Sequence, residues 1–219
     1  MGKLIVIEGL DGSGKGTQAA LLAEYLRNKG CRVREISFPD YESEGSVLVR
    51  MYLDGKLGDD PDATNAYAAS MFYAADRYVT YRTDWEKDYA DPETIVIANR
   101  YTTANAYHQL SKLPEEQWDG FLAWLWDFEF VRLGLPKPDA VVALSMRPEV
   151  SRALIEKRCV ETGVKKDIHE ADSDYLERCY KALHYVCERE SWHLIECAEG
   201  GVPYTIPVMQ GKICGVLGL

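Results

Sequence analysis

The sequence lacks any long hydrophobic run. Across its 219 residues, no uninterrupted apolar stretch approaches the roughly 20 residues that a membrane-spanning helix requires. The chain begins Met1-Gly2-Lys3 and passes directly into a strand-like segment, which leaves no room for a signal peptide. We therefore expect no membrane partner and no secretion.

Closely spaced cysteine pairs are also missing. No Cys-x-x-Cys pair occurs, and the six cysteines are scattered at Cys31, Cys159, Cys179, Cys187, Cys197 and Cys214. This distribution favours reduced thiols over disulfides or a zinc site. It predicts a cytoplasmic protein.

The chain has few positive charges relative to negative ones. It contains 25 Lys and Arg residues and 35 Asp and Glu residues, which gives a net charge of −10. A general nucleic-acid-binding protein is usually basic, so we expect no nucleic-acid partner. Any site for a phosphorylated ligand must concentrate its positive charge locally. The length predicts one domain, residues 1–219.

The most informative segment is a glycine-rich loop between an apolar run, Leu4-Ile5-Val6-Ile7, and a helical pattern, Gln18 to Asn28. Glycines let backbone N–H groups converge on an anion, and a helix N-terminus adds its positive dipole end. A lysine in the loop can reach the β- and γ-phosphates of a nucleotide. We therefore expect ATP to be bound by Gly9, Asp11, Gly12, Ser13, Gly14, Lys15, Gly16 and Thr17.

The loop departs from the usual pattern at one position. Ser or Thr ordinarily follows the lysine and supplies a hydroxyl to Mg²⁺, but here Gly16 intervenes and Thr17 comes one residue later. Thr17 is the candidate metal ligand, with Mg²⁺ held either directly or through water. The alternative is a glycine-rich loop that binds no nucleotide.

Strand-like and helical segments alternate along the chain. Short apolar runs predict strands at Leu4–Glu8, Arg32–Ser37, Thr94–Ala98, Ala140–Leu144 and His193–Cys197. Helices are expected at Val47–Leu53, Ala63–Tyr89, Pro114–Arg132, Glu149–Cys159 and Ser173–Arg189. This rhythm predicts an α/β protein, a P-loop three-layer α/β/α fold with a five-stranded parallel sheet. Residues 200–219 have no assigned structure, and we expect them to pack against the domain.

Three arginines are candidates for binding phosphate. Arg100 directly follows the third predicted strand, Arg77 lies within a predicted helix, and Arg50 lies in the helix after the second strand. Ligands of parallel α/β sheets bind at the carboxyl ends of the strands, and guanidinium groups suit bidentate phosphate contacts. Tyr73 precedes Arg77 by four residues, so the two share a helix face. The alternatives are solvated arginines and, for Phe72 and Tyr73, simple core packing.

Five motifs in order resemble the thymidylate kinase family. They are Ile7 to Lys15, Ser37-Phe38-Pro39-Asp40, Phe72 to Arg77, Asn99-Arg100-Tyr101 and Gly134-Leu135-Pro136-Lys137-Pro138-Asp139. The resemblance spans nearly the whole chain. It implies a homodimeric enzyme that uses ATP and Mg²⁺ to phosphorylate dTMP.

The resemblance also implies roles for individual residues. Lys15 would hold the ATP phosphates, and Asp11 would approach the 3′-hydroxyl of the acceptor sugar. Tyr73 would stack on thymine, with Phe72 as its neighbour if the register slips. The remaining acceptor contacts implied are Phe38 and Pro39, Arg50 and Arg100 on the acceptor phosphate, Arg77 on the base or the phosphate, and Asn105 and Gln109 near the thymine edge.

Residues 147–170 resemble the helical lid of such kinases. Some members carry a catalytic arginine in the phosphate loop, where this chain has Gly12. The missing charge would come from the lid, whose basic residues are Arg147, Arg152, Lys157, Arg158, Lys165 and Lys166. Arg152, Arg158 and Lys166 are the catalytic candidates, and the sequence does not choose among them.

Three departures from the family separate this chain from its typical members. Gly16-Thr17-Gln18 is a form typical of adenylate kinases. Asn99 replaces the usual aspartate, and an amide cannot act as a carboxylate toward Mg²⁺. Asp167-Ile168-His169-Glu170 replaces the commoner Asp-Arg-Ile-Glu of the lid.

The predicted reaction is direct in-line transfer of the γ-phosphoryl group of ATP to dTMP, giving dTDP for dTTP biosynthesis. The acceptor phosphate is already a nucleophile, so no covalent intermediate is needed. The alternatives are a kinase for another monophosphate, a P-loop switch without an acceptor, and an inactive binding module. The aromatic segment Trp118 to Phe130 packs either inside the monomer or in a dimer.

Overall fold

A central parallel sheet organises the molecule. The computed structural model describes residues 1–163, 169 and 172–219, without the side chains of 157–159 and 161–162. Its strands are β1 (Lys3–Gly9), β2 (Arg32–Ser37), β3 (Thr94–Asn99), β4 (Ala140–Ser145) and β5 (His193–Glu196). They pair in parallel in the order β2-β3-β1-β4-β5. The predicted five-stranded parallel sheet is confirmed, with strand ends within two residues of those expected.

The central strand β1 is apolar on both faces because both faces are covered. Leu4 and Val6 pack into one hydrophobic cluster, while Ile5 and Ile7 pack into another on the opposite face. Successive side chains of a strand alternate between the faces. A run without polar alternation therefore indicates a strand between two helical layers.

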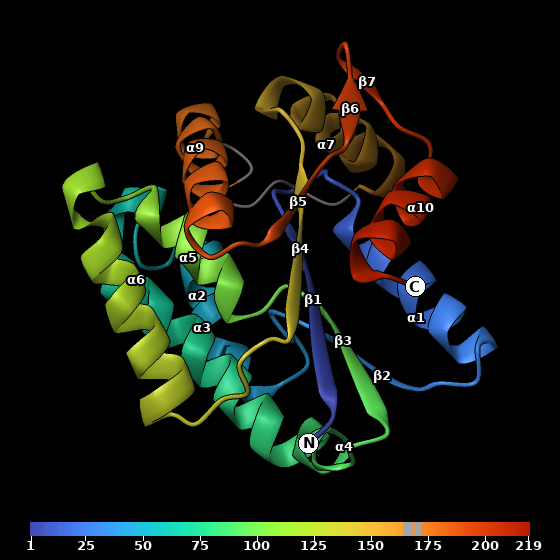
Figure 1. Cartoon of the computed structure of the whole chain (residues 1–219). Coiled ribbons are helices and arrows are strands. Elements are labelled where there is room, and N and C mark those ends of the chain that lie inside the picture. The colour runs from blue at the N-terminus through green and yellow to red at the C-terminus, as the bar shows by residue number, and fades with distance from the viewer. Residues whose placement is uncertain (164–168, 170–171) are drawn as a thin grey trace.

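Helices cover both faces of the sheet (Figure 1). One layer holds α1 (Lys15–Asn28), α7 (Pro148–Thr162) and α10 (Ile206–Leu217). The other holds α2 (Val47–Leu53), α3 (Ala66–Thr80), α4 (Glu86–Ala90), α5 (Thr102–Leu110), α6 (Trp118–Trp126) and α9 (Ser173–Arg189). The three-layer α/β/α fold is thus confirmed. No helix among the described residues is long and apolar enough to cross a membrane.

The two longest predicted helices each contain a π-helical turn. The segment expected at Ala63–Tyr89 begins instead at α3, where the Asn65 side chain caps the backbone N–H of Ala68 at 2.9 Å. It continues through a π-helical turn (Tyr81–Trp85) into α4. The segment expected at Pro114–Arg132 comprises a 3₁₀ turn, α6 and a second π-helical turn (Asp127–Arg132). Such turns often occur at functional sites.

Two helices were not assigned from the sequence. Helix α5 directly follows Tyr101 and is almost wholly buried, and it contains no Asp, Glu, Lys or Arg that would mark an exposed side. Helix α10 follows a short hairpin of β6 (Ala198–Glu199) and β7 (Val202–Pro203). It buries Met209 and Ile213 against α1, so the expectation that residues 200–219 pack against the domain is confirmed.

The motif that ends at Asp139 lies at the amino ends of the strands, far from the phosphate loop along the sheet. Asp139 Oδ2 accepts a hydrogen bond of 2.7 Å from the Leu4 backbone N–H. The Asp139 backbone N–H donates to the Leu4 carbonyl at 2.8 Å. This reciprocal pair fixes β4 beside β1, so the motif has a structural role in this chain.

Candidate active site

The glycine-rich loop wraps the carboxyl end of β1 and leads into α1. Gly12 and Gly14 have left-handed φ values of 79° and 82°, which glycine adopts without strain. A Cβ at position 12 would lie 2.8 Å from the Ser151 carbonyl oxygen of α7. The first backbone N–H groups of α1 have no intrahelical acceptor, and among the described residues no side chain caps them. The Ser13 hydroxyl is buried and finds no partner among the described residues. Within the described part of the chain, the loop therefore presents hydrogen-bond donors without partners, the arrangement that an anion-binding loop requires.

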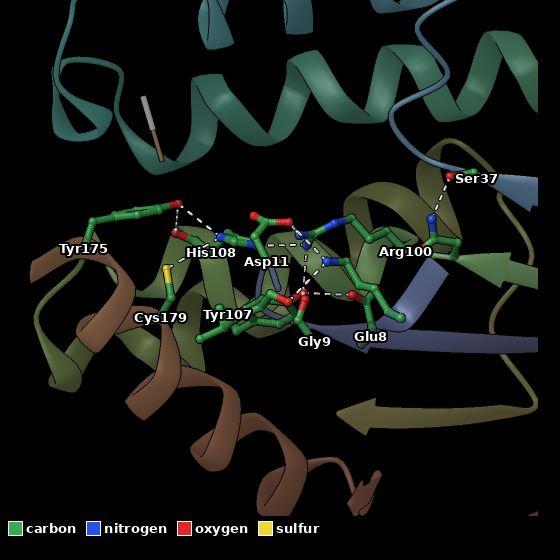
Figure 2. Close-up of polar contacts among 12 residues, drawn as sticks. Glu8, Gly9, Asp11, Ser37, Arg100, Tyr107, His108, Tyr175 and Cys179 are labelled. Atoms are coloured by element: carbon green, nitrogen blue, oxygen red, sulfur yellow. Dashed lines mark hydrogen bonds and ion pairs between the residues drawn. The ribbon is translucent and has the colours of Figure 1, made fainter. Parts of the chain in front are cut away.

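Asp11 joins this loop to the end of β3. Its Oδ1 accepts a hydrogen bond from Arg100 Nη2 at 2.7 Å (Figure 2). The same oxygen accepts one from Lys15 Nζ at 3.1 Å. Lys15 Nζ also lies 3.2 Å from the Leu10 carbonyl oxygen. One carboxylate thus holds two cations that come from different segments of the chain.

The backbone of Arg100 is in an uncommon conformation. Its φ of 66° lies in the left-handed region. That conformation costs a non-glycine residue about 1–3 kcal/mol, and residues that adopt it cluster at functional sites. The Arg100 N–H donates to the Ile7 carbonyl at 3.1 Å. The guanidinium Nη1 reaches the Tyr107 hydroxyl at 3.0 Å and His108 Nε2 at 2.9 Å. Because a guanidinium only donates, His108 Nε2 is unprotonated.

Sequence reasoning missed Glu8, the buried carboxylate behind this cluster. Glu8 accepts hydrogen bonds from the Tyr101 backbone N–H at 3.0 Å, the Thr103 hydroxyl at 2.5 Å and the Tyr107 hydroxyl at 2.9 Å. Burial raises its pKa, against the lowering effect of Arg100 and these hydrogen bonds. Two signals were available: Glu8 belongs to the Ile7 to Lys15 motif, and a charged residue next to an apolar run requires partners when it is buried. Glu8 fixes the start of α5.

The electrostatics of the cluster favour the charged forms of Asp11 and Arg100. Burial alone would raise the pKa of Asp11, but the charges of Arg100 and Lys15 outweigh it and hold that pKa well below its usual range. Asp11 in turn raises the pKa of Arg100 well above its ordinary value, against the effect of burial. Burial, with the charge of Arg100, lowers the pKa of Lys15 and holds that of His108 well below its usual range. His108 is therefore neutral.

A pocket opens beside the cluster and brings most of the predicted acceptor residues together. Its lining includes Asp11, Phe38, Pro39, Tyr41, Leu53, Tyr73, Arg77, Arg100, Tyr101, Ala104, Asn105, His108, Gln109 and His169. The Gln109 side chain is fully buried, and neither of its amide atoms has a partner among the described residues. An unpaired buried amide costs free energy, and a ligand in the pocket would supply its missing partner.

Arg77 meets a partner that was not predicted. Its Nε and Nη2 donate to the carboxylate oxygens of Glu129 at 2.7 and 2.5 Å, and both side chains are almost wholly buried. Glu129 lies in the π-helical turn after α6 and also accepts a hydrogen bond from Asn105. Arg77 and Asn105 therefore share one carboxylate. No sequence motif signalled Glu129.

Two predicted acceptor residues do not line the pocket. The ring of Phe72 packs against Tyr52, with centroids 6.4 Å apart, while Tyr73, one position on, lines the pocket. Arg50 Nη1 donates to the Tyr41 carbonyl at 2.7 Å and to the Ser46 hydroxyl. Arg50 thus holds the loop after β2, beside the pocket.

The two residues predicted to lie near the metal, Thr17 and Asn99, both have neutral side chains. Thr17 is exposed on α1, and Asn99 Nδ2 donates to the Ser37 hydroxyl at 2.9 Å. The buried Asn99 Oδ1 has no partner among the residues that the structure describes. A Cβ at position 16 would lie 3.7 Å from Asn99 Nδ2. In the same described part of the chain, no cluster of three or more His, Cys, Asp or Glu side chains could hold a metal alone.

The lid is described only in part. Helix α7 carries Arg152 directly after Ser151, the residue whose carbonyl faces Gly12. The side chains of Lys157 and Arg158, and residues Lys165, Lys166, Asp167, Ile168 and Glu170, lie outside the described residues. His169 is described, and its Nε2 lies 2.8 Å from the Tyr52 hydroxyl. Burial and the charge of Lys112 lower its pKa to about 3.

The fold and this site define a P-loop protein of the nucleotide kinase class. A family model for thymidylate kinase matches residues 7–201. The thymidylate kinase of Mycobacterium tuberculosis is 33% identical over 177 residues, covering 80% of this chain and 81% of that protein. A probable thymidylate kinase of Methanothermobacter thermautotrophicus is 36% identical over 163 residues, covering 74% and 72%.

A solved structure agrees in fold. The thymidylate kinase of Candida albicans superposes with a TM-score of 0.67 at 19% identity, covering 99% of this chain and 91% of that one. The chain belongs to the thymidylate kinase family.

Proposed function

We propose that this protein phosphorylates dTMP, using ATP, by direct in-line transfer of the γ-phosphoryl group, and that it supplies dTDP for dTTP biosynthesis. Membership of the thymidylate kinase family supports the reaction. The observation that carries the proposal is the position of Asp11, which belongs to the phosphate loop, lines the acceptor pocket and binds Arg100 at its edge. Donor and acceptor would therefore meet at one carboxylate and its two cations.

On the donor side, the loop would bind the ATP phosphates. The residues are Gly9, Asp11, Gly12, Ser13, Gly14, Lys15, Gly16 and Thr17, with the free N–H groups at the start of α1 as donors. Lys15 would exchange its contact with the Leu10 carbonyl for phosphate oxygens. The neutral oxygens of Thr17 and Asn99 fit a Mg²⁺ that arrives bound to ATP and is held mainly by phosphate and water. The metal would neutralise phosphate charge during transfer.

On the acceptor side, Arg100 would bind the dTMP phosphate, and Tyr73 would stack on the base. Arg77, Asn105 and Gln109 would contact the polar edge of thymine, with Phe38 and Pro39 forming a wall of the pocket. Phe72 and Arg50 remain predicted contacts that require a change of position on binding. Positioning and charge neutralisation would provide the catalysis, because the acceptor phosphate is itself the nucleophile.

The ionised state of Asp11 determines its role. A carboxylate whose pKa is held low by two cations is a poor proton acceptor. It would therefore orient Arg100 and Lys15 and accept a hydrogen bond from the 3′-hydroxyl of the acceptor sugar. Arg152 and Arg158 of the lid remain the predicted catalytic cations on the donor, since Gly12 leaves no charge in the loop.

The proposed enzyme is a cytoplasmic homodimer. The five described cysteines are all free thiols, as expected in a reducing compartment. On α3, Tyr67 and Met71 are 45% and 47% exposed, one helical turn apart, and Tyr67 packs on Trp124 of α6. This apolar face suits a subunit interface. Light scattering of the wild type and of Met71→Glu tests it: a wild-type dimer that Met71→Glu dissociates supports the interface, and a wild-type monomer contradicts it.

The test of the proposed reaction is ADP release with ATP, Mg²⁺ and each of dTMP, dUMP, UMP, CMP, AMP and GMP. Turnover with dTMP well above all others supports the proposal. Preferred turnover of another monophosphate would retain the phosphate loop but contradict the base site. ATP binding without turnover of any acceptor would favour a switch or an inactive module.

A paired variant isolates the base site. Tyr73→Ala should raise the KM for dTMP roughly 5- to 150-fold, since base stacking contributes about 1–3 kcal/mol. Tyr78→Ala removes a tyrosine that is 40% exposed on the same helix and should leave that KM unchanged. Equal effects of the two variants would contradict the assignment of Tyr73.

A further inference from the structure

A single buried carboxylate connects the polar side chains at the back of the acceptor pocket. Glu129 is 0% exposed and accepts hydrogen bonds from three side chains. Arg77 contributes two, at 2.7 and 2.5 Å, the Thr102 hydroxyl contributes one at 2.7 Å, and Asn105 Nδ2 contributes one at 3.2 Å. Two of these three donors, Arg77 and Asn105, line the pocket, and Glu129 itself does not.

This arrangement fixes which way the Asn105 amide points. Its Nδ2 lies between Glu129 Oε1 and the Ser70 carbonyl oxygen, at 3.2 and 3.3 Å. A carboxylate and a carbonyl can only accept, so the nitrogen of the amide must face them. Both of its hydrogens are then used, and Oδ1 is the amide atom left for the pocket. Asn105 therefore presents an acceptor.

The same carboxylate determines what Arg77 presents. Nε and one hydrogen of Nη2 are committed to Glu129. The remaining N–H groups, on Nη1 and Nη2, are the only polar atoms that Arg77 can offer to a ligand, and they are all donors. The back of the pocket thus combines one acceptor, from Asn105, with donors from Arg77.

This donor and acceptor pattern matches one kind of pyrimidine edge. Thymine and uracil carry a ring N3–H donor beside the O4 acceptor, which complements an acceptor beside donors. Cytosine carries an acceptor at N3 and an amino donor at position 4, the reverse pattern. A mismatched base would leave buried polar groups unpaired, which discriminates more strongly than a missing apolar contact.

We propose that Glu129 is a positioning residue for specificity: by fixing Asn105 and Arg77 together, it sets the pocket to accept a pyrimidine with an N3–H and to reject cytosine. Glu129 touches no substrate and acts only through its two partners. This inference rests on the proposed phosphorylation of dTMP and adds to it the residue that fixes the polarity of base recognition.

The first test uses the wild-type protein and a chemical probe. N3-methyl-dTMP retains the ring, sugar and phosphate of dTMP but lacks the N3–H. Calorimetric titration should show at least tenfold weaker binding of N3-methyl-dTMP than of dTMP, and dCMP should bind as weakly. Equal binding of dTMP and dCMP by the wild type would overturn the inference without any variant.

The second test replaces the carboxylate. Glu129→Gln places an amide NH₂ against groups that are themselves donors, which removes the constraint on Asn105. The ratio of kcat/KM for dTMP to that for dCMP should fall at least tenfold, mainly through a higher KM for dTMP, with kcat changed less. Thr102→Val is the matched control, because it removes a hydrogen bond from the same carboxylate without touching the pocket. It should lower the melting temperature and leave the ratio unchanged.

The outcomes separate this inference from the proposed function. Wild-type turnover of dTMP, together with an unchanged dTMP to dCMP ratio in Glu129→Gln, overturns the role of Glu129 alone. An equal loss of ratio in Thr102→Val also overturns it, since a general loosening of the core would then explain both. Absence of dTMP turnover in the wild type overturns the proposed function instead. If Glu129→Gln does not fold, the titrations with dCMP and N3-methyl-dTMP still test the donor and acceptor pattern that Asn105 and Arg77 present to the base.

Discussion

Arg100 Nη2 lies 2.7 Å from Asp11 Oδ1, and this ion pair connects the end of β3 to the phosphate loop. Asp11 also holds Lys15 at 3.1 Å. The Asp11 side chain therefore connects the loop to the acceptor pocket and orients two cations. A substrate phosphate entering between Lys15 and Arg100 would be neutralised from both sides, which is the main requirement of phosphoryl transfer between nucleotides.

The first prediction concerns that carboxylate. Asp11→Asn keeps the size of the side chain but removes the charge that orients Arg100 and Lys15. We expect kcat to fall by about 10²–10³, the typical effect of removing one preorganised electrostatic group, with a smaller change in the KM for ATP. Steady-state kinetics with both substrates varied measures this. A kcat within threefold of the wild type would show that Asp11 does not organise the site.

The second prediction concerns Gly12. Its φ of 79° is left-handed, and a Cβ there would lie 2.8 Å from the Ser151 carbonyl and 3.2 Å from Ile155 Cγ1. Gly12→Ala should therefore destabilise the fold by about 1–3 kcal/mol and raise the KM for ATP. Urea unfolding and donor kinetics provide the two measurements.

A glycine in α10 offers the matched control. A Cβ at position 211 would have no atom within 4 Å, and the backbone of Gly211 is that of an ordinary helix. Gly211→Ala should stabilise the protein by about 0.5–1 kcal/mol without changing the kinetics. Similar behaviour of the two variants would show that α7 does not lie against the loop in solution.

The third prediction is a pH dependence at Asp76. Burial raises the pKa of this carboxyl to about 6, although its Oδ2 accepts a hydrogen bond from the Asp40 backbone N–H at 2.9 Å. The native state then binds the proton more tightly than the unfolded chain does, where the pKa of the carboxyl is near its ordinary value of 3.8. Stability from this group is complete at low pH and falls as the pH rises through about 6.

Asp76→Asn removes that titration. Relative to the wild type, its free energy of unfolding should rise by about 1 kcal/mol between pH 5 and pH 8. Urea denaturation at several pH values in this range measures the difference. Parallel stability curves for the two proteins would show that the pKa of Asp76 is not raised in the native state.

The fourth prediction tests the unusual metal region. A Cβ at position 16 makes only an ordinary contact with Asn99 Nδ2, so Gly16→Ser should fold normally. Gly16→Ser restores a hydroxyl, and Asn99→Asp restores a carboxylate. Each should lower the Mg²⁺ concentration that gives half-maximal rate at fixed ATP, and the double variant should lower it further. An unchanged Mg²⁺ requirement in all three would show that phosphate and water hold the metal without positions 16 and 99.

The sequence predicted the fold and the phosphate loop because both depend on local patterns. Apolar runs between two helical layers, and glycines ahead of a lysine, are visible in a few consecutive residues. It also predicted Arg77 and Asn105 as acceptor contacts, and the structure places both in the lining of the pocket. Glu129 could not be found this way. It lies 52 residues from Arg77 in the chain, and a lone glutamate in an aromatic helix gives no sign that it faces a buried guanidinium.

Helix α5 shows a second limit of sequence reasoning. All its residues except Ala104 are buried, mainly against α3, α6, α9 and β1, so its polar side chains lie in the interior and do not mark a solvent-facing side. Glu8 fixes its start through the Tyr101 N–H and the Thr103 hydroxyl. Tertiary packing, rather than local propensity, therefore determines the helix that delivers Asn105 and His108 to the pocket.

The most direct test follows the phosphoryl group itself. Wild-type protein is incubated with γ-labelled ATP, Mg²⁺ and dTMP, and the labelled products are separated. We expect the label to appear in dTDP in the same amount as the ADP released. Label in free phosphate, or in no product despite bound ATP, would contradict direct transfer to dTMP.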